Sequence, residues 1–325
     1  MRHLATIQTI AEIKSIEGAD AIEAARINGW WVVVKKDEFK VEDKVCYFEI
    51  DSWIPTHLAP FLSKGKEPRT YNDVQGERLR TVKLRGQLSQ GLVLPYTGSG
   101  NEGDDLTEAL GIQKWERPVS AQLAGIARGN FPSFICKTDQ ERIQNLPEVF
   151  EDLHAKYEVS IKLDGSSMTV YFHEGEMGVC SRNIDLKLDQ TGNTFVDVAK
   201  ELFTDKYFDG LAIQGELMGA CIQCNREKLE KHAFFVFDIW SIEGQCYWDT
   251  QSVREFCSRN NLQHVPVLHK EVSLTDLKLF TTDAILKYAD GVSLTHPVRE
   301  GLVFKNIDGQ SSFKAISNLF LLKEA

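Results

Sequence analysis

A lysine followed by an aspartate and a glycine is the pattern in this sequence that predicts chemistry most directly. Lys162-Leu163-Asp164-Gly165 comes directly after Tyr157 to Ile161, a run that predicts a strand. Gly165 permits a tight turn there, so the lysine can project into a pocket. A neutral lysine is a nucleophile, but its ordinary pKa of about 10.4 must first be lowered by burial or neighbouring cations. The same letters also occur in an ordinary turn at the end of a strand.

Five further short patterns follow in the C-terminal half of the chain. Each alone has an ordinary explanation: an isolated arginine, a turn, or phenylalanines in a strand that pack in a core. They are Ser181-Arg182-Asn183, Gly215-Glu216-Leu217, Phe234-Phe235-Val236-Phe237-Asp238, Glu300-Gly301-Leu302-Val303-Phe304-Lys305 and Phe313-Lys314-Ala315-Ile316. Their order along the chain is far less expected by chance than any one of them.

Together with the first lysine, these patterns resemble the covalent nucleotidyltransferase superfamily of RNA ligases, DNA ligases and mRNA capping enzymes. The resemblance implies that Lys162 attacks the α-phosphate of ATP and keeps AMP on its nitrogen. It also implies that Arg182 contacts the nucleotide or substrate phosphates and that Glu216 binds the ribose. By the same resemblance, the ring of Phe234 would stack on adenine. Strand alternation places Phe235 and Phe237 on the opposite face, where they would pack in the core.

The last two patterns imply a metal and a phosphate site. By the same resemblance, Asp164 and Glu300 hold a magnesium or manganese ion, for which carboxylate oxygens are suitable ligands. Lys305 and Lys314 are expected to bind ATP. The superfamily usually has a second lysine where this chain has Ile316, so either Lys314 acts alone or another lysine, Lys305 or Lys323, contributes the second charge.

The position of the motifs in the chain favours an RNA ligase. The sequence ends 11 residues after Lys314, whereas DNA ligases and capping enzymes with this core continue into a further C-terminal domain. The segments 234–239 and 313–318 look similar to RNA ligases of the Deinococcus and Naegleria type. That resemblance implies three steps: Lys162 takes AMP from ATP, AMP passes to a 5′-phosphate, and a 3′-hydroxyl displaces it. RNA repair is the expected role, on RNA ends that include a nicked duplex.

The first hundred residues predict a small β-barrel. The runs Trp30 to Val34 and Val45 to Ile50 are rich in β-branched and aromatic residues, and a further strand pair is predicted from Arg80 to Leu94. These segments resemble the OB-fold modules attached to some RNA-ligating proteins. The fold class is therefore α+β, with an N-terminal OB-fold barrel followed by a nucleotidyltransferase domain built on an ATP-grasp-like antiparallel sheet. The predicted domains are 1–103 and 146–325, with a linker region at 104–145.

Local charge predicts where nucleic acid binds. The chain has 37 basic and 47 acidic residues, a net charge of −10, so a polyanion needs a local basic site. Residues 64–85 carry seven lysines and arginines against three acidic residues. From these we predict a nucleic-acid-binding group of Arg78, Arg80, Lys83 and Arg85. A solvated strand edge protected by its charges is the alternative.

The remaining expectations come from composition. No apolar segment is long enough to span a membrane, which predicts an intracellular, cytoplasmic protein, and a monomer is expected. Seven scattered cysteines indicate reduced thiols. The pair Cys221 and Cys224 has the spacing of zinc ligands, but His232 is the only nearby further candidate. A DNA ligase, a GTP-dependent capping enzyme and a non-catalytic RNA-binding protein remain the alternative functions.

Overall fold

The computed structural model describes residues 3–115, 126–189 and 192–323, which form two compact units. The first unit comprises Met1–Pro118 together with Gln144–Pro147 and Leu321–Ala325. The second comprises Val119–Ile143 and Glu148–Phe320. Within the described part of the chain, no helix is both long and apolar enough to cross a membrane.

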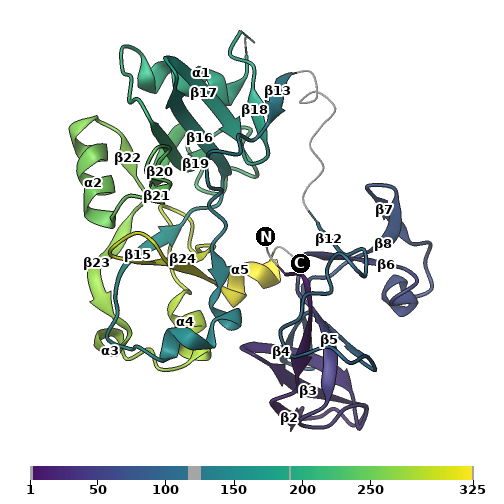
Figure 1. The fold of residues 1–325 in the computed structure, drawn as a ribbon. Helices are drawn as coiled ribbons and strands as arrows, with labels where there is room; N and C mark the ends of the chain where they lie inside the picture. Colours follow the sequence, from purple (N-terminus) through teal and green to yellow (C-terminus); the bar gives the residue numbers. More distant parts are fainter. Residues whose placement is uncertain (1–2, 116–125, 190–191, 324–325) are drawn as a thin grey trace. The chain divides into compact units, whose positions relative to one another are not determined.

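The first unit is built from short antiparallel strands (Figure 1). The elements described between residues 3 and 115 are β1 (Ala5–Thr9), β2 (Glu12–Ser15), β3 (Ile22–Ile27), β4 (Trp30–Lys35), β5 (Lys44–Phe48), β6 (Ser52–Pro55), the 3-10 turn η1 (Pro60–Ser63), β7 (Arg69–Tyr71), β8 (Val74–Arg78), β9 (Thr81–Leu84), β10 (Gln87–Gln90), β11 (Leu92–Pro95) and β12 (Gln113–Lys114). They pair in the orders β1-β5-β11, β2-β3-β4, β9-β10 and β12-β6-β8-β7.

Alternating apolar residues of these strands form the core of the first unit. In β4, Trp30, Val32 and Val34 are buried, as a strand with one covered face requires. A short chain of hydrogen bonds crosses this core: the Trp30 ring nitrogen donates to Asn145 Oδ1, and the Asn145 amide donates to Glu49 Oε1. Asn145 lies far from β4 in sequence, so a short returning segment completes this unit.

The second unit contains two larger sheets. The eight-stranded sheet has the order β13-β18-β17-β16-β19-β20-β21, with β22 pairing on β20. Its strands are β13 (Ala127–Asn130), β16 (Ser166–His173), β17 (Glu176–Ser181), β18 (Ile184–Leu186), β19 (Leu211–Met218), β20 (Ala233–Ser241), β21 (Cys246–Tyr247) and β22 (Gln263–His264).

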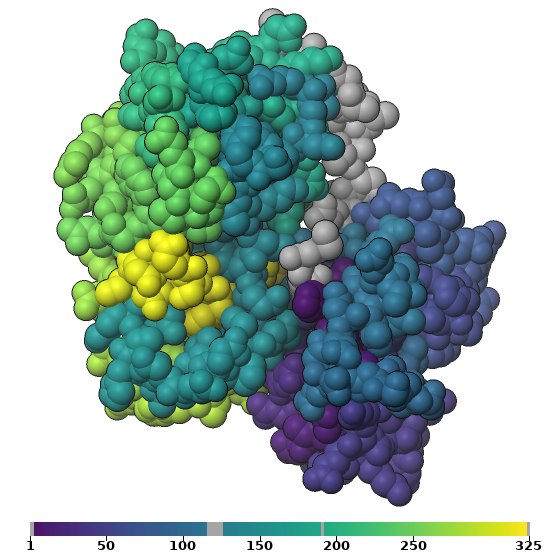
Figure 2. Space-filling view, in the orientation of Figure 1, coloured from purple at the N-terminus to yellow at the C-terminus, as the bar shows by residue number. Residues whose placement is uncertain are grey.

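The five-stranded sheet of the second unit has the order β14-β25-β24-β15-β23. Its strands are β14 (Glu141–Arg142), β15 (Lys156–Lys162), β23 (Val267–Ser273), β24 (Gly301–Asn306) and β25 (Ser312–Ile316). β14 pairs in parallel with β25 near the end of the chain. In Figure 2 the yellow C-terminal residues accordingly reach the surface between green and teal segments from much earlier in the sequence.

Short helices flank these sheets (Figure 1). They are η3 (Ile143–Asn145), η4 (Pro147–Phe150), α1 (Thr194–Phe203), α2 (Thr250–Arg259), α3 (Leu274–Leu277), α4 (Thr282–Tyr288) and α5 (Asn318–Lys323). The side chains of Asn193 and Asp249 cap the N-termini of α1 and α2. The apolar faces of both helices pack on the eight-stranded sheet, and their buried residues share one core with it.

The region predicted as a linker contains ordered structure on both sides of residues 116–125, which lie outside the described residues. β12 pairs with β6, β13 with β18, and β14 with β25. Strands of two to four residues carry too little periodic pattern to be recognised in a sequence. The predicted domain boundaries stay a prediction.

Candidate active site

The register of the five-stranded sheet places three lysines on one face. Lys162 at the end of β15 lies opposite Gly301, and Lys314 in β25 lies opposite Val303. Lys305, further along β24, lies opposite Glu158. Side chains that face each other across strands, or that are two apart along a strand, project to the same side. Patterns 152 residues apart in sequence therefore meet on one surface.

Lys162 is surrounded by carboxylates. Its Nζ lies 2.8 Å from Glu300 Oε2, and about a quarter of its side chain is exposed. Burial disfavours the charged form, but the carboxylates of Glu300, Glu216 and Asp164 outweigh burial and raise the pKa of Lys162. In the free protein the lysine is therefore protonated. The sequence analysis expected burial or neighbouring cations to lower this pKa, but the structure places carboxylates beside the lysine instead.

The glycine after the lysine motif allows these groups to approach. A Cβ atom at Gly165 would lie 2.4 Å from the Leu217 carbonyl oxygen in β19, closer than any side chain permits. The Gly165 amide donates to Glu216 Oε1 at 2.9 Å. Gly301 has no space either, since its Cβ would lie 2.1 Å from the Ala315 carbonyl oxygen. Both glycines are required because strands carrying site residues touch there.

The carboxylates themselves are destabilised as anions. Burial raises the pKa of Glu216 to about 7, although Lys162 opposes the shift, and burial likewise raises the pKa of Glu300. Among residues 3–115, 126–189 and 192–323, no three His, Cys, Asp or Glu side chains lie close enough to hold a metal ion as a group. The donor set nevertheless suits a hard divalent cation, because Asp164, Glu216 and Glu300 all present oxygen near one lysine. Such a cation would retain water ligands.

Phe234 and Phe235 in β20 face the opposite sides of the sheet from those that the sequence predicted. Phe234 is only 2% exposed and belongs to the core, and its ring occupies the space above Gly215, where a Cβ would lie 2.6 Å from the ring. Phe235 lies opposite Glu216 and is partly exposed. Opposed residues share a face, so the aromatic ring on the Glu216 face is that of Phe235.

Arg182 and Lys314 share a carboxylate that the sequence analysis did not single out. Asp139 Oδ2 lies 3.5 Å from Arg182 Nη2, and Asp139 Oδ1 lies 3.5 Å from Lys314 Nζ. The two cations come from β17–β18 and β25, and the short segment before β14 brings the aspartate to them. Asp139 was assigned to the linker because no periodic pattern or known motif marks Lys137-Thr138-Asp139.

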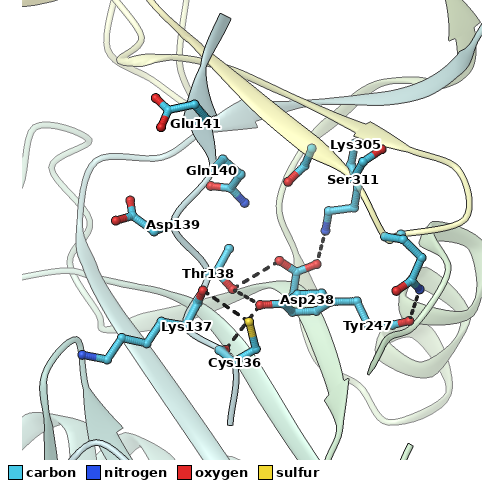
Figure 3. Close-up of a pocket in the computed structure, with 13 residues that line it drawn as sticks. Cys136, Lys137, Thr138, Asp139, Gln140, Glu141, Asp238, Tyr247, Lys305 and Ser311 are labelled. Carbon is cyan, nitrogen blue, oxygen red and sulfur yellow. Dashed lines mark hydrogen bonds and ion pairs between the residues drawn. The ribbon is translucent and has the colours of Figure 1, made fainter. Parts of the chain in front are cut away.

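Lys305 lies deep in the same sheet face and is 6% exposed. Its Nζ donates to the Phe237 carbonyl oxygen at 2.5 Å and forms an ion pair with Asp238, which is also buried. Figure 3 shows this pair at a cavity of about 290 Å³, with Thr138 and Tyr247 beside it. Thr138 Oγ1 donates to Gln214 Oε1 at 2.7 Å. Lys305 thus has a protein partner at this position.

Two further residues lie near the lysine face: the apolar Ile316 and the cationic Arg226. Ile316 lies opposite Gly301 and is 3% exposed, so it contributes only apolar surface to the lysine face. Arg226, in the loop after β19, has its Nη1 3.5 Å from Asp164 Oδ2. The sequence analysis missed this arginine, because the loop Gly219 to His232 has no regular period that would show which way its residues point.

The predicted nucleic-acid-binding residues lie in the first unit and are of two kinds. Arg78 is held within the fold: its Nη2 lies 2.6 Å from Asp51 Oδ1, and its guanidinium stacks 3.8 Å from the Trp115 ring centroid. Arg80, Lys83 and Arg85 are exposed on or beside the hairpin of β9 and β10. Arg78 is thus the least accessible of the four.

The cysteines are free thiols in the described part of the chain, and Cys221 and Cys224 are exposed. His232 near them makes a contact of 2.8 Å to the Ala220 carbonyl oxygen through Nε2. The two thiols and the histidine form no metal-binding group among the residues that the structure describes.

Comparison with known proteins identifies both units. A model of an OB-fold domain matches residues 4–96, and a model of the RNA ligase family matches residues 155–316. An apo mutant of Naegleria gruberi RNA ligase is 45% identical, with 98% of this chain and 97% of that chain covered and a TM-score of 0.89. The same ligase with pyrophosphate is 46% identical, with 99% and 98% covered and a TM-score of 0.88. No curated protein sequence matches.

These similarities confirm the predicted fold class, an N-terminal OB fold before a sheet-rich domain, and the predicted kinship with the ligases of the Naegleria type. The agreement covers nearly the full length of both chains at 45% identity. The chain therefore belongs to the RNA ligase family.

Proposed function

We propose that this ATP-dependent RNA ligase joins 3′-hydroxyl and 5′-phosphate ends with Lys162 as its nucleophile. The observation that carries the assignment is the position of Lys162 at the open end of β15, 2.8 Å from Glu300 and within the field of two further carboxylates. A lysine in such a cluster can exchange its proton when the surrounding charge changes.

The mutants of Naegleria gruberi RNA ligase support this choice of residues. They alter, in chain order, a lysine, an aspartate, a glutamate, a second glutamate and a second lysine. The same residue types occur in the same order here, and the first two are separated by one residue in both chains. In this sequence they are Lys162, Asp164, Glu216, Glu300 and Lys314.

ATP binding is assigned to the face on which these residues meet. Forms of the Naegleria ligase were solved with ATP and manganese and with AMP and manganese. On this chain Arg182 and Lys314 supply positive charge for the phosphates, and their shared partner Asp139 must give way to them. Phe235 is better placed than Phe234 to stack on adenine, because Phe234 is enclosed in the core.

The proton on Lys162 must pass to solvent before the amine can attack the α-phosphorus of ATP and displace pyrophosphate. In the free protein the carboxylates hold that proton, since they raise the pKa of the lysine. A divalent ion such as magnesium or manganese, held by oxygens of Asp164 and Glu300 together with water, would offset the negative charge around Lys162 and stabilise negative charge on phosphate. With that charge offset, Glu300 and Glu216 would favour the charged amine less, and Asp164 at the turn would keep the lysine oriented.

RNA binding is assigned to the exposed hairpin of the OB fold. Val82 and Leu84 are each 42% exposed there, next to Lys83 and Arg85. Cationic side chains beside exposed apolar ones suit a sugar-phosphate backbone with unstacked bases. A nicked duplex as the substrate, a monomeric state and an intracellular location are part of the proposal.

Labelling with α-³²P-ATP tests the nucleophile directly. The wild-type protein is expected to retain label after denaturation, and Lys162→Ala is expected to retain none. Lys156→Ala provides a matched control, because it removes a lysine from the other end of the same strand, β15, where the side chain is partly exposed and pairs with exposed Asp276. Labelling that persists in Lys162→Ala would refute the assignment. Preference for GTP over ATP would favour a capping-type enzyme, and absence of any adduct would favour a non-catalytic RNA-binding protein.

A further inference from the structure

Arg226 contacts three segments that surround the lysine site, although it belongs to none of the recognised patterns. Its Nη1 lies 3.5 Å from Asp164 Oδ2, and its Nη2 donates to the Val298 carbonyl oxygen at 3.4 Å. Its guanidinium carbon lies 4.5 Å from the centroid of the Phe320 ring. Only 12% of the arginine side chain is exposed. One planar group thus joins the turn after Lys162, the segment before Glu300 and helix α5.

The loop that carries Arg226 is fixed from within. The Asn225 side chain accepts from the Leu229 amide at 3.0 Å and donates to the Leu229 carbonyl oxygen at 3.1 Å, which closes the loop on itself. This conformation is specific, because Asn225 and Lys228 both have positive φ. Arg226 therefore extends from a rigid support.

The next residue attaches the loop to the segment before Glu300. Glu227 is 5% exposed and accepts from the Thr295 amide at 2.6 Å and from the His296 amide at 2.9 Å. Burial opposes its charge, yet hydrogen bonds from Ser293, Thr295 and His296 lower the pKa of Glu227 overall. The carboxylate is accordingly held as an anion, and it attaches the loop to the segment.

We propose that Arg226 is a positioning residue for lysine adenylylation, which holds the Asp164 carboxylate beside Lys162 and couples it to the segment that carries Glu300. Val298, which accepts from Arg226, lies two residues before Glu300. The two carboxylates that flank Lys162 are thereby aligned by one cation. The inference rests on the proposed function of Lys162.

The geometry requires arginine and not merely a positive charge. The contacts to Asp164 and Val298 use different nitrogens of the guanidinium, while its flat surface lies over Phe320. A lysine ammonium is a single point charge that cannot make all three contacts at once. Arg226→Lys therefore separates the effect of the charge from that of the planar group.

The experiment measures single-turnover formation of the lysyl-adenylate at saturating ATP and manganese, together with ATP affinity by equilibrium binding. Arg226→Gln is expected to slow adenylylation about 10- to 100-fold, as misplacement of a reacting group does. Arg226→Lys should be slowed by at least about 3-fold, since the planar contacts are lost. Lys231→Gln, which removes an exposed positive charge from the same loop, should stay within about 2-fold of wild type.

A double-mutant cycle with Asp164→Asn distinguishes positioning from a general structural effect. If Arg226 acts through Asp164, Arg226→Gln should change the rate and the ATP affinity by less than about 2-fold in the Asp164→Asn background. If Arg226→Gln lowers the adenylylation rate or the ATP affinity by the same factor with Asp164 as with Asn at position 164, the inference is overturned. Where the Asp164→Asn background is too slow for a rate, the ATP affinity is compared. If Arg226→Gln fails to fold, the same cycle with Arg226→Lys decides it.

The inference and the proposed function fail in different ways. A wild-type protein that forms no adduct on Lys162 would remove the proposed function itself. Normal labelling of the wild type with equally fast labelling of Arg226→Gln and Arg226→Lys would leave Lys162 as the nucleophile and remove only the role of Arg226.

Discussion

Lys162 and Lys305 lie on the same face of the same sheet, yet their surroundings are opposite. Lys305 is almost fully buried and has one carboxylate, Asp238, and one carbonyl oxygen as partners. Lys162 is more exposed and has three carboxylates around it, one of which, Glu216, has a pKa raised to about 7. One carboxylate matches the charge of Lys305, whereas Lys162 and Arg226 share three carboxylates. An unbalanced cluster can take up a cation or exchange protons, whereas a balanced buried pair can only support the fold.

The largest effect that would break this comparison is expected at Lys305. Lys305→Met leaves Asp238 buried without its cation and should lower the free energy of unfolding by about 3–5 kcal/mol. Urea denaturation monitored by tryptophan fluorescence measures it. The double variant Lys305→Met with Asp238→Leu should recover most of the loss, because neither charge is then buried alone.

The outcome also bears on the sequence interpretation of Lys305 as an ATP-binding residue. If Lys305→Met folds with unchanged stability but binds ATP at least about 10-fold more weakly, the lysine acts on the nucleotide and the contrast with Lys162 disappears. If stability falls and ATP affinity of the folded fraction is kept, its role is structural.

The order of short motifs, through its resemblance to a known superfamily, predicted the fold class, and three of the residues it named, Asp164, Glu216 and Glu300, lie around Lys162. Short patterns with fixed spacing and strand alternation are local properties, and the sheet register then brings them together across 152 residues. Which of two adjacent phenylalanines faces the site was not decidable in that way. It depends on the pairing of β19 with β20, where a register shift follows Gln214. A single shift of this kind reverses the face of every later residue.

The residues that sequence reasoning missed all lie in irregular segments. Arg226 and Asp139 reach the site from loops whose direction is set by contacts to distant parts of the chain, such as Glu227 with Thr295. No period of 2 or 3.6 residues describes such segments. Arg78 shows the converse, since its charge predicted nucleic-acid binding but Asp51 and Trp115 engage it within the fold.

A smaller effect is expected from the protonation of Glu216. Its folded-state pKa of about 7 lies above the ordinary value of 4.5 because burial disfavours the anion. The native state therefore binds more protons than the unfolded state between those values, and stability declines as pH rises from about 4.5 to 7. Since Glu216 is partly exposed, the expected decline from this group is about 1–3 kcal/mol.

Glu216→Gln isolates this contribution, because glutamine resembles the protonated acid and does not titrate. In metal-free buffer with a chelator, the variant should have nearly the stability of wild type at pH 5 and exceed it by about 1–3 kcal/mol at pH 7.5. Parallel pH profiles for the two proteins would show that the carboxylates at Lys162 are not strained as anions. The contrast between the two lysines would then rest on exposure alone.

The smallest effect separates the two kinds of basic residue in the OB fold. Lys83→Gln and Arg85→Gln should each weaken binding to a nicked RNA duplex by about 3- to 10-fold and reduce the slope of log affinity against log salt by about 1, because each removes one phosphate contact.

Arg78→Gln should instead lower the stability of the first unit by about 1–3 kcal/mol, since it breaks the ion pair with Asp51 and the stack on Trp115. Lys36→Gln, an exposed lysine elsewhere in that unit, is the matched control for charge. A salt slope that changes for Arg78→Gln but not for the hairpin variants would reverse the assignment and place the RNA along β8.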